Sequence, residues 1–121
     1  MATKLKSSYM QVVTIEELPG YDIKEVKGLV WGTTVRSKFL GKELMAMMKS
    51  MVGGEVKEYT NLVNEARRYV IEKMVANARA LGANAIVGVR IGTSAQTIPG
   101  ATEIFSYGTA VVVEPVKRGK A

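Results

Sequence analysis

Apolar and polar residues change their spacing several times along the chain, and each change predicts a new element. A β-branched run from Met10 to Thr14 predicts a short strand, and Pro19-Gly20 predicts the turn that follows it. Alternation from Tyr21 to Val35 then predicts a longer strand. Plain alternation gives this strand a face of small and aliphatic residues, namely Val26, Gly28, Val30 and Gly32.

The spacing becomes helical in the middle of the chain. Apolar residues recur every three or four positions from Phe39 to Met51, which predicts a short helix that ends before Gly53-Gly54. A second apolar stripe predicts a long helix from about Glu55 to Leu81. Gly82 is well placed as its left-handed C-terminal cap.

Two more strands complete the pattern, from Ala85 to Ile91 and from Glu103 to Glu114, with a Gly, Ser, Thr and Pro loop between them. The predicted order is strand, strand, helix, helix, strand, strand. We therefore predict an α+β domain in which an antiparallel sheet packs on one long helix plus a shorter one.

The last strand has two uncharged faces. Its small face carries Ser106, Gly108 and Ala110 and would let a long helix lie close to the sheet. The opposite face is apolar too, although the second side of an antiparallel sheet in a monomer is normally polar. No element of this chain is left to cover it, so we predict a homo-oligomer with an interface formed by Leu29, Trp31, Phe105 and Tyr107.

Composition supports one globular domain. The chain has 121 residues, of which 47% are hydrophobic, and we expect a flexible extension at 1–9, a domain at 10–114 and a basic tail at 115–121. It has no apolar run long enough to span a membrane and no secretory signal core, so we expect a soluble cytoplasmic protein. Five of the seventeen basic residues lie in the two tails, so the net charge of +6 gives little support for nucleic-acid binding.

The chain contains no cysteine and no histidine. These residues most often serve as nucleophile, as near-neutral proton shuttle and as zinc ligand. We therefore predict a non-enzymatic protein without cofactor, catalytic residues or metal site. The alternative is an enzyme that uses lysine or a carboxylate in a cleft between subunits, for which Arg36, Arg90 and Glu103 are the best candidates.

Three stretches of the chain resemble the YbjQ-like family of uncharacterised proteins. They are Pro19-Gly20-Tyr21 with Val26 to Gly32, then Val52 to Thr60, and then Ala80 to Arg90, which Tyr107 to Val111 follows near the end. The resemblance implies a dodecin-like subunit in which extra short strands join five copies into a propeller-like ring. The family is also commonly labelled as heavy-metal-binding.

Two binding hypotheses remain beside the structural role. Met45, Met47, Met48 and Met51 could hold a soft metal through their thioethers, but they lie on an apolar helical stripe, where core packing is the favoured interpretation. Trp31 could stack on a planar ligand of unknown identity, with Thr33, Arg36 and Arg90 nearby. Interface packing is the favoured interpretation of Trp31 as well.

Overall fold

The computed structural model describes residues 10–36, 57–94 and 102–117. In chain order the described elements are β1 (Gln11–Val12), β2 (Tyr21–Arg36), α2 (Lys57–Ala80), β3 (Ala85–Thr93) and β4 (Thr102–Pro115). The predicted α+β class is confirmed. The helix predicted at 39–51, and with it the two-helix order, lies outside the described residues, as do the extension at 1–9 and the tail from 118.

The described strands form one mixed sheet in the order β1-β3-β4-β2. β4 is antiparallel to both β2 and β3, whereas β1 is parallel to β3. The expectation of a wholly antiparallel sheet was therefore wrong. β1 and β2 run in the same direction, and two parallel strands need a crossover connection. Here the crossover is the segment 13–20, which passes from one edge of the sheet to the other.

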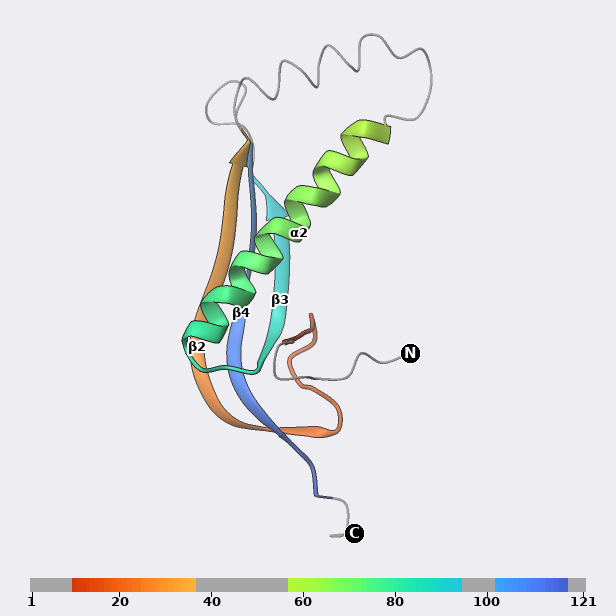
Figure 1. The fold of residues 1–121 in the computed structure, drawn as a ribbon. Coiled ribbons are helices and arrows are strands. Elements are labelled where there is room, and N and C mark those ends of the chain that lie inside the picture. The colour runs from red at the N-terminus through yellow and green to blue at the C-terminus, as the bar shows by residue number, and fades with distance from the viewer. Residues whose placement is uncertain (1–9, 37–56, 95–101, 118–121) are drawn as a thin grey trace.

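α2 lies diagonally across one face of this sheet (Figure 1). Its buried stripe consists of Ala66, Val70, Met74 and Ala78, as the sequence spacing predicted. Gly82 has a φ of 87°, and its N–H donates to the Arg79 carbonyl at 2.9 Å. The Ala83 N–H donates to the Ala78 carbonyl at 3.1 Å. Together these two bonds form a Schellman cap, which confirms the predicted helix end.

Small residues let α2 approach the sheet closely. A Cβ on Gly32 would lie 2.2 Å from the Val70 carbonyl oxygen and 2.9 Å from the Met74 nitrogen. The fully buried Ser106 donates its hydroxyl to the same Val70 oxygen at 2.9 Å. The small face predicted for β4 therefore does serve helix packing.

Gly28 has a different role from the one that plain alternation suggested. A Cβ on Gly28 would meet no atom within 4 Å, and its φ of 125° lies in a region that favours glycine. It follows a β-bulge at which the pairing of β2 with β4 shifts between Val26 and Gly28. Gly88 likewise lies in a bulge of β3 and meets no atom within 4 Å. Among these glycines, Gly32 alone makes room for the helix.

The face of the sheet away from α2, here called the second face, is divided into two halves. Where β4 ends, the crossover covers it, because Leu18 packs there on Val111, Val113, Ala85 and Val87. We call these four residues and Leu18 the covered half. The prediction that this chain leaves the whole second face uncovered was therefore wrong for this half. The sequence predicts only a turn at Pro19-Gly20, whereas the buried Leu18 beside it forms a small core with the sheet.

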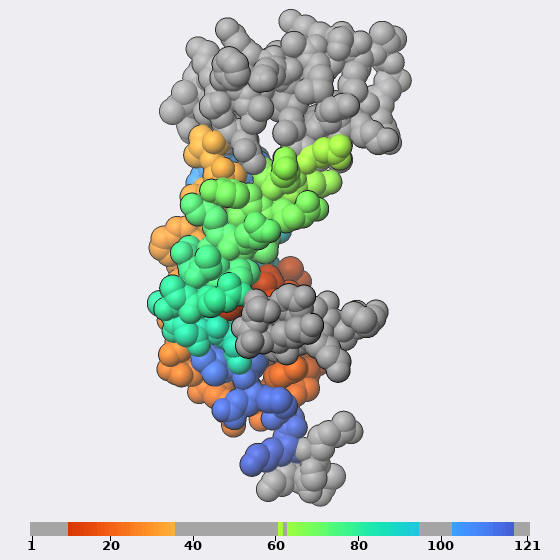
Figure 2. All heavy atoms as spheres, in the orientation of Figure 1, coloured from red at the N-terminus to blue at the C-terminus, as the bar shows by residue number. Residues whose placement is uncertain are grey.

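Backbone hydrogen bonds fix the start of the crossover along the edge of β3. Val13 donates to Ile86 and accepts from Val89, at 3.0 Å each, and the Gly88 N–H donates to the Ile15 carbonyl at 2.9 Å. Figure 2, which views the molecule from the helix side, shows α2 over the sheet and the orange residues of β2 at the surface along the opposite edge. The edge of β3 is thus partly protected, whereas β2 pairs only with β4 among the strands that the structure describes.

Candidate functional site

The candidate site is the other half of the second face, towards the end of β2 and the start of β4. Two rows of residues cross the strands there. Trp31 lies opposite Tyr107, which in turn lies opposite Arg90, and Thr33 lies opposite Phe105, which lies opposite Gly92. Leu29 adds one more apolar side chain next to Thr109. We call Leu29, Trp31, Thr33, Phe105 and Tyr107 the open half.

Large apolar side chains of the open half reach solvent in the single chain. Leu29 is 62% exposed, Trp31 is 56% exposed and Tyr107 is 43% exposed. By contrast, Val111 and Val113 of the covered half are exposed by 1% and 3%. Exposure of several large apolar groups side by side is typical of an interaction surface, whereas scattered single residues are not.

The aromatic side chains of β4 are held in place by one another and by a glycine of β3. The Phe105 and Tyr107 rings are stacked with centroids 6.2 Å apart and an angle of 15° between their planes. A Cβ on Gly92 would lie 2.6 Å from the Phe105 ring, so this ring lies directly on the backbone of β3. Since Phe105 rests on its own chain, Trp31 and Tyr107 provide more of the accessible aromatic surface.

Two further valines, Val26 and Val35, extend this surface along β2. The sequence analysis predicts neither of them as part of the interface. Val26 is 65% exposed and lies opposite Val111, whereas Gly28 lies opposite Ala110. The bulge between them therefore puts Val26 on the second face, and its predicted place beside Gly28 was wrong. Val35 is similarly exposed and lies opposite Glu103. For Val35 a signal was present, because it continues the alternation of Leu29, Trp31 and Thr33.

The polar candidates have structural partners. The Thr33 hydroxyl donates to a Glu103 carboxylate oxygen at 2.8 Å, which links the ends of β2 and β4. The Arg90 guanidinium donates to the Thr14 carbonyl at 2.9 Å and to the Val89 carbonyl at 2.8 Å, so it holds the crossover on β3. Arg36 is the last residue of β2, and its side chain lies outside the described part. Of the four ligand-site candidates, the register places Trp31 and Arg90 on either side of Tyr107.

The donor atoms do not fit a heavy-metal site. In the described ranges no three residues of the Cys, His, Asp and Glu types come together as ligands, and the whole chain lacks Cys and His. Soft metals prefer sulfur and imidazole donors. Met74 is fully buried in the core beneath α2, and the methionines between 45 and 51 lie outside the described residues. No step of a metal-dependent reaction follows from these donors.

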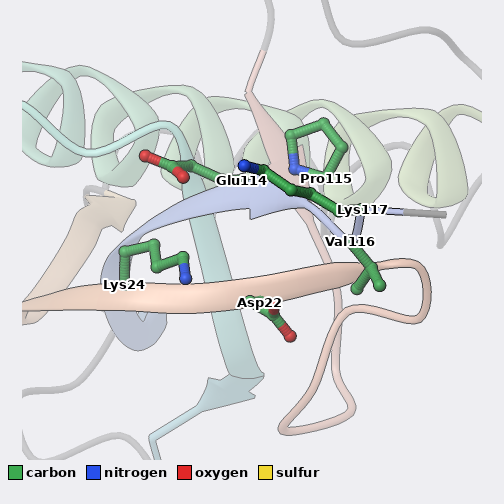
Figure 3. A pocket seen from close by; sticks show the side chains of 6 residues that line it. All are labelled: Asp22, Lys24, Glu114, Pro115, Val116 and Lys117. Atoms are coloured by element: carbon green, nitrogen blue, oxygen red, sulfur yellow. The ribbon is translucent and has the colours of Figure 1, made fainter. Parts of the chain in front are cut away.

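A shallow hollow lies at the other end of the sheet, far from the open half. Figure 3 shows its six lining residues, which are Asp22, Lys24, Glu114, Pro115, Val116 and Lys117. Asp22 lies opposite Glu114 in the pairing of β2 with β4, and Lys24 and Lys117 offset their charge. Because acidic and basic groups balance in this shallow hollow, neither sign of charge is gathered there to select a ligand.

No helix in the described part of the chain is both long and apolar enough to cross a membrane. A salt bridge joins Lys27 and Glu25 at 2.8 Å on β2, away from the open half. The open half itself carries no such pair. Its character is therefore set by aromatic and aliphatic groups, with Arg90 and Glu103 at its borders.

Comparison with known proteins identifies relatives along nearly the whole chain. A family model described as "Putative heavy-metal-binding" matches residues 10–114. A UPF0145 protein of Thermus thermophilus is 50% identical over 106 residues, which cover 88% of this chain and 92% of that protein. A UPF0145 protein of Saccharolobus solfataricus is 50% identical over 109 residues, which cover 90% of this chain and 95% of the Saccharolobus protein.

One solved structure shares the fold. It is the crystal structure of a protein of unknown function that belongs to the DUF74 family, from Pediococcus pentosaceus. The TM-score is 0.56 at 19% sequence identity, with 87% of this chain and 98% of that chain covered. The sequence resemblance is thus confirmed by relatives that keep half of its residues and by a model that spans the sheet and the helix, and the chain belongs to the YbjQ (UPF0145) family.

Proposed function

We propose that this protein is a non-enzymatic homo-oligomer with a binding or structural role, in which the open half is buried between copies. The observation that carries the proposal is the contrast within one sheet face. Leu29, Trp31 and Tyr107 are exposed in the single chain, whereas Val111 and Val113 beside them are buried by the crossover.

The energetic argument rests on apolar area. Burial of a large apolar side chain stabilises by roughly 1.5–3 kcal/mol when the side chain passes from full exposure to full burial. Leu29, Trp31 and Val35 each expose more than half of their surface, so association would recover a large part of that amount at each position. No charged residue lies between Gly28 and Val35 to oppose this burial.

A ring of five copies is the proposed form of the assembly, and its support is the family resemblance described above. The cytoplasm is the proposed compartment, on sequence grounds. Heavy-metal binding is not part of the proposed function, because the donor atoms of this chain do not suit such metals.

A second candidate function is binding of a planar ligand at the same interface. The row of Trp31, Tyr107 and Arg90 favours it, because aromatic faces stack on planar groups and a guanidinium pairs with an anionic substituent. Titration with flavins, nucleotides and haem would test it through tryptophan fluorescence. Trp31 is the only tryptophan, so unchanged emission with every ligand would contradict this function.

The test of assembly is the molar mass in solution by light scattering. We expect a mass of about five times the 13.1 kDa of one chain. Leu29→Lys places a charge in the open half and should shift the mass to that of a single chain, with Trp31 emission moving to longer wavelength as water reaches the indole. The helical circular dichroism should stay unchanged.

Leu81→Lys is the matched control, because Leu81 is the same residue type, is also exposed and lies at the end of α2 outside the open half. This variant should assemble like the parent chain. A parent chain that has the mass of one copy at micromolar concentration would overturn the proposed function.

A further inference from the structure

We propose that the open half binds an aromatic anion, with the ring system of the ligand on Trp31 and Tyr107 and its negative group paired with Arg90. This inference rests on the second candidate function and deepens it, because it names the charge, the size and the orientation of the ligand. Three observations carry it: two accessible aromatic side chains next to each other, an arginine at the end of their row, and the distribution of charge around that row.

The first observation is the pair of aromatic side chains. Trp31 is 56% exposed and Tyr107 is 43% exposed, and they lie directly opposite each other in the pairing of β2 with β4. The Cβ atoms of such opposite residues are about 5 Å apart. A rigid ring system that lies across the two strands can therefore contact both side chains.

Exposure alone does not make a stacking surface, as Tyr69 of α2 shows. Tyr69 is 45% exposed, but the Lys73 ammonium nitrogen lies over its ring, 5.6 Å from the centroid. This cation–π contact is favourable, and a ligand would have to displace it. Among the described residues no cation lies over Trp31 or Tyr107, so within that part of the molecule their exposed surface is available for stacking.

The second observation is an arginine at the end of the aromatic row. Arg90 lies opposite Tyr107 on the side away from Trp31, and its side chain is exposed. Its bonds to the Thr14 and Val89 carbonyls both use the Nη1 nitrogen. Nε and Nη2 carry further N–H donors, which no residue in the described ranges accepts. The guanidinium is thus held in place and keeps donors that suit a carboxylate or a similar anion.

The spacing of the strands sets the size of the ligand. Trp31 and Arg90 lie on the two strands that flank β4, so they are separated by about two strand spacings of roughly 4.8 Å each. Two fused aromatic rings with an anionic group at one end can extend over this distance. A single ring with the same group is too short to contact Trp31, Tyr107 and Arg90 together.

The third observation is the distribution of charge around the row. Glu103 lies near the start of β4, where its carboxylate accepts the Thr33 hydroxyl at 2.8 Å. A carboxylate at this border repels an anionic group. On the other side of the row, Leu29 and Thr109 lie opposite each other and carry no charge. The negative group of the ligand is therefore favoured at Arg90, and this fixes the orientation of the ligand.

Three matched probes test this inference on the unmodified chain by isothermal titration calorimetry. The compound 2-naphthoate is planar and anionic, 2-naphthalenemethanol is planar and uncharged, and decahydro-2-naphthoate is anionic but not planar. We expect 2-naphthoate to bind about tenfold more tightly than either of the others, because each of them lacks one recognised feature. Equal binding of 2-naphthoate and 2-naphthalenemethanol would overturn the pairing with Arg90 while leaving the binding of planar ligands intact.

Arg90→Gln then tests where the negative group lies. This variant should bind 2-naphthoate about tenfold more weakly and should bind 2-naphthalenemethanol like the parent chain. An equal loss for both probes would mean that Arg90 acts only through the structure, and it would overturn the pairing. Arg68→Gln is the matched control, because it removes an exposed arginine of α2 and should leave the affinity for both probes unchanged.

Tyr107→Leu and Tyr69→Leu compare two tyrosines of nearly equal exposure. Tyr107→Leu should weaken the binding of 2-naphthoate about fivefold through lost stacking, whereas Tyr69→Leu should bind it like the parent chain. Parent-like binding by Tyr107→Leu would contradict the site. Light scattering on the same samples tests the proposed homo-oligomer separately. A parent chain that has the mass of one copy and still prefers 2-naphthoate would overturn the oligomer and leave this inference intact.

Discussion

The covered half and the open half of the second face are built from one alternation along the same strand. Val111 and Val113 are buried, whereas Tyr107 is 43% exposed, although all three continue a single series of apolar residues on β4. The difference lies in what passes over them, because the crossover carries Leu18 across one half only. Residue type predicts that a face is apolar, and chain topology decides how much of that face the chain itself covers.

The largest effect that tests this contrast is expected from Leu18→Ala. Leu18 is 5% exposed and is the crossover's contribution to the covered half. Its truncation should lower the free energy of unfolding by about 2–5 kcal/mol, as for other buried leucines. Chemical denaturation should show this loss at every protein concentration.

Leu29→Ala in the open half is the matched comparison. Because Leu29 is mostly exposed in the single chain, its truncation should change the free energy of unfolding of that chain by less than about 0.5 kcal/mol. The truncation should instead weaken the proposed assembly. The unfolding midpoint of the variant should therefore fall below that of the parent chain only at protein concentrations at which the parent chain is associated. Equal, concentration-independent losses for both leucines would remove the distinction between the halves.

An intermediate effect is expected from Asn84→Ala. The Asn84 side chain bonds both backbone groups of Val113, accepting from its N–H at 2.8 Å and donating to its carbonyl at 3.0 Å. Loss of both bonds should cost about 1–3 kcal/mol of folding stability. Asn84→Asp keeps the acceptor for the Val113 N–H but sets a carboxylate oxygen against the Val113 carbonyl, so it should not restore the full stability in thermal denaturation. A harmless Asn84→Ala would mean that these bonds do not hold the covered half together.

The smallest effect is expected from Thr33→Val in the open half. It keeps the shape of the side chain and removes one hydrogen bond to Glu103, at an expected cost of at most about 1 kcal/mol, because water can solvate the carboxylate. Glu103→Gln keeps an acceptor and should cost less still. A loss from Thr33→Val that exceeds the loss from Asn84→Ala would reverse the predicted order of the two halves.

Local signals predicted much of the fold. Helical spacing and Gly82 marked α2 and its end, and unbroken alternation marked β4 together with its two faces. The bulges could not be predicted, since each depends on one unpaired residue between strands far apart in sequence. For that reason Val26 was assigned to the wrong face.

The candidate site was predictable in its apolar part and not in its polar part. Leu29, Trp31, Phe105 and Tyr107 follow from alternation on two strands. The roles of Arg90 and Thr33 do not, because the Thr14 carbonyl and the Glu103 carboxylate that they bond become neighbours only through the fold. The burial of Leu18 was hidden for a similar reason, since it is a lone apolar residue between Glu17 and Pro19.

The division of β2 into a charged and an uncharged stretch also bears on how cells handle newly made copies. From Gly28 to Val35 the strand combines high β-propensity with no charge and no proline, which is the composition of segments prone to cross-β aggregation. In the proposed oligomer, a copy that has folded but has not yet met its partners would still expose Leu29, Trp31 and Val35 of this stretch. Synthesis that outpaces the proposed assembly would therefore create a substrate for chaperones and proteases.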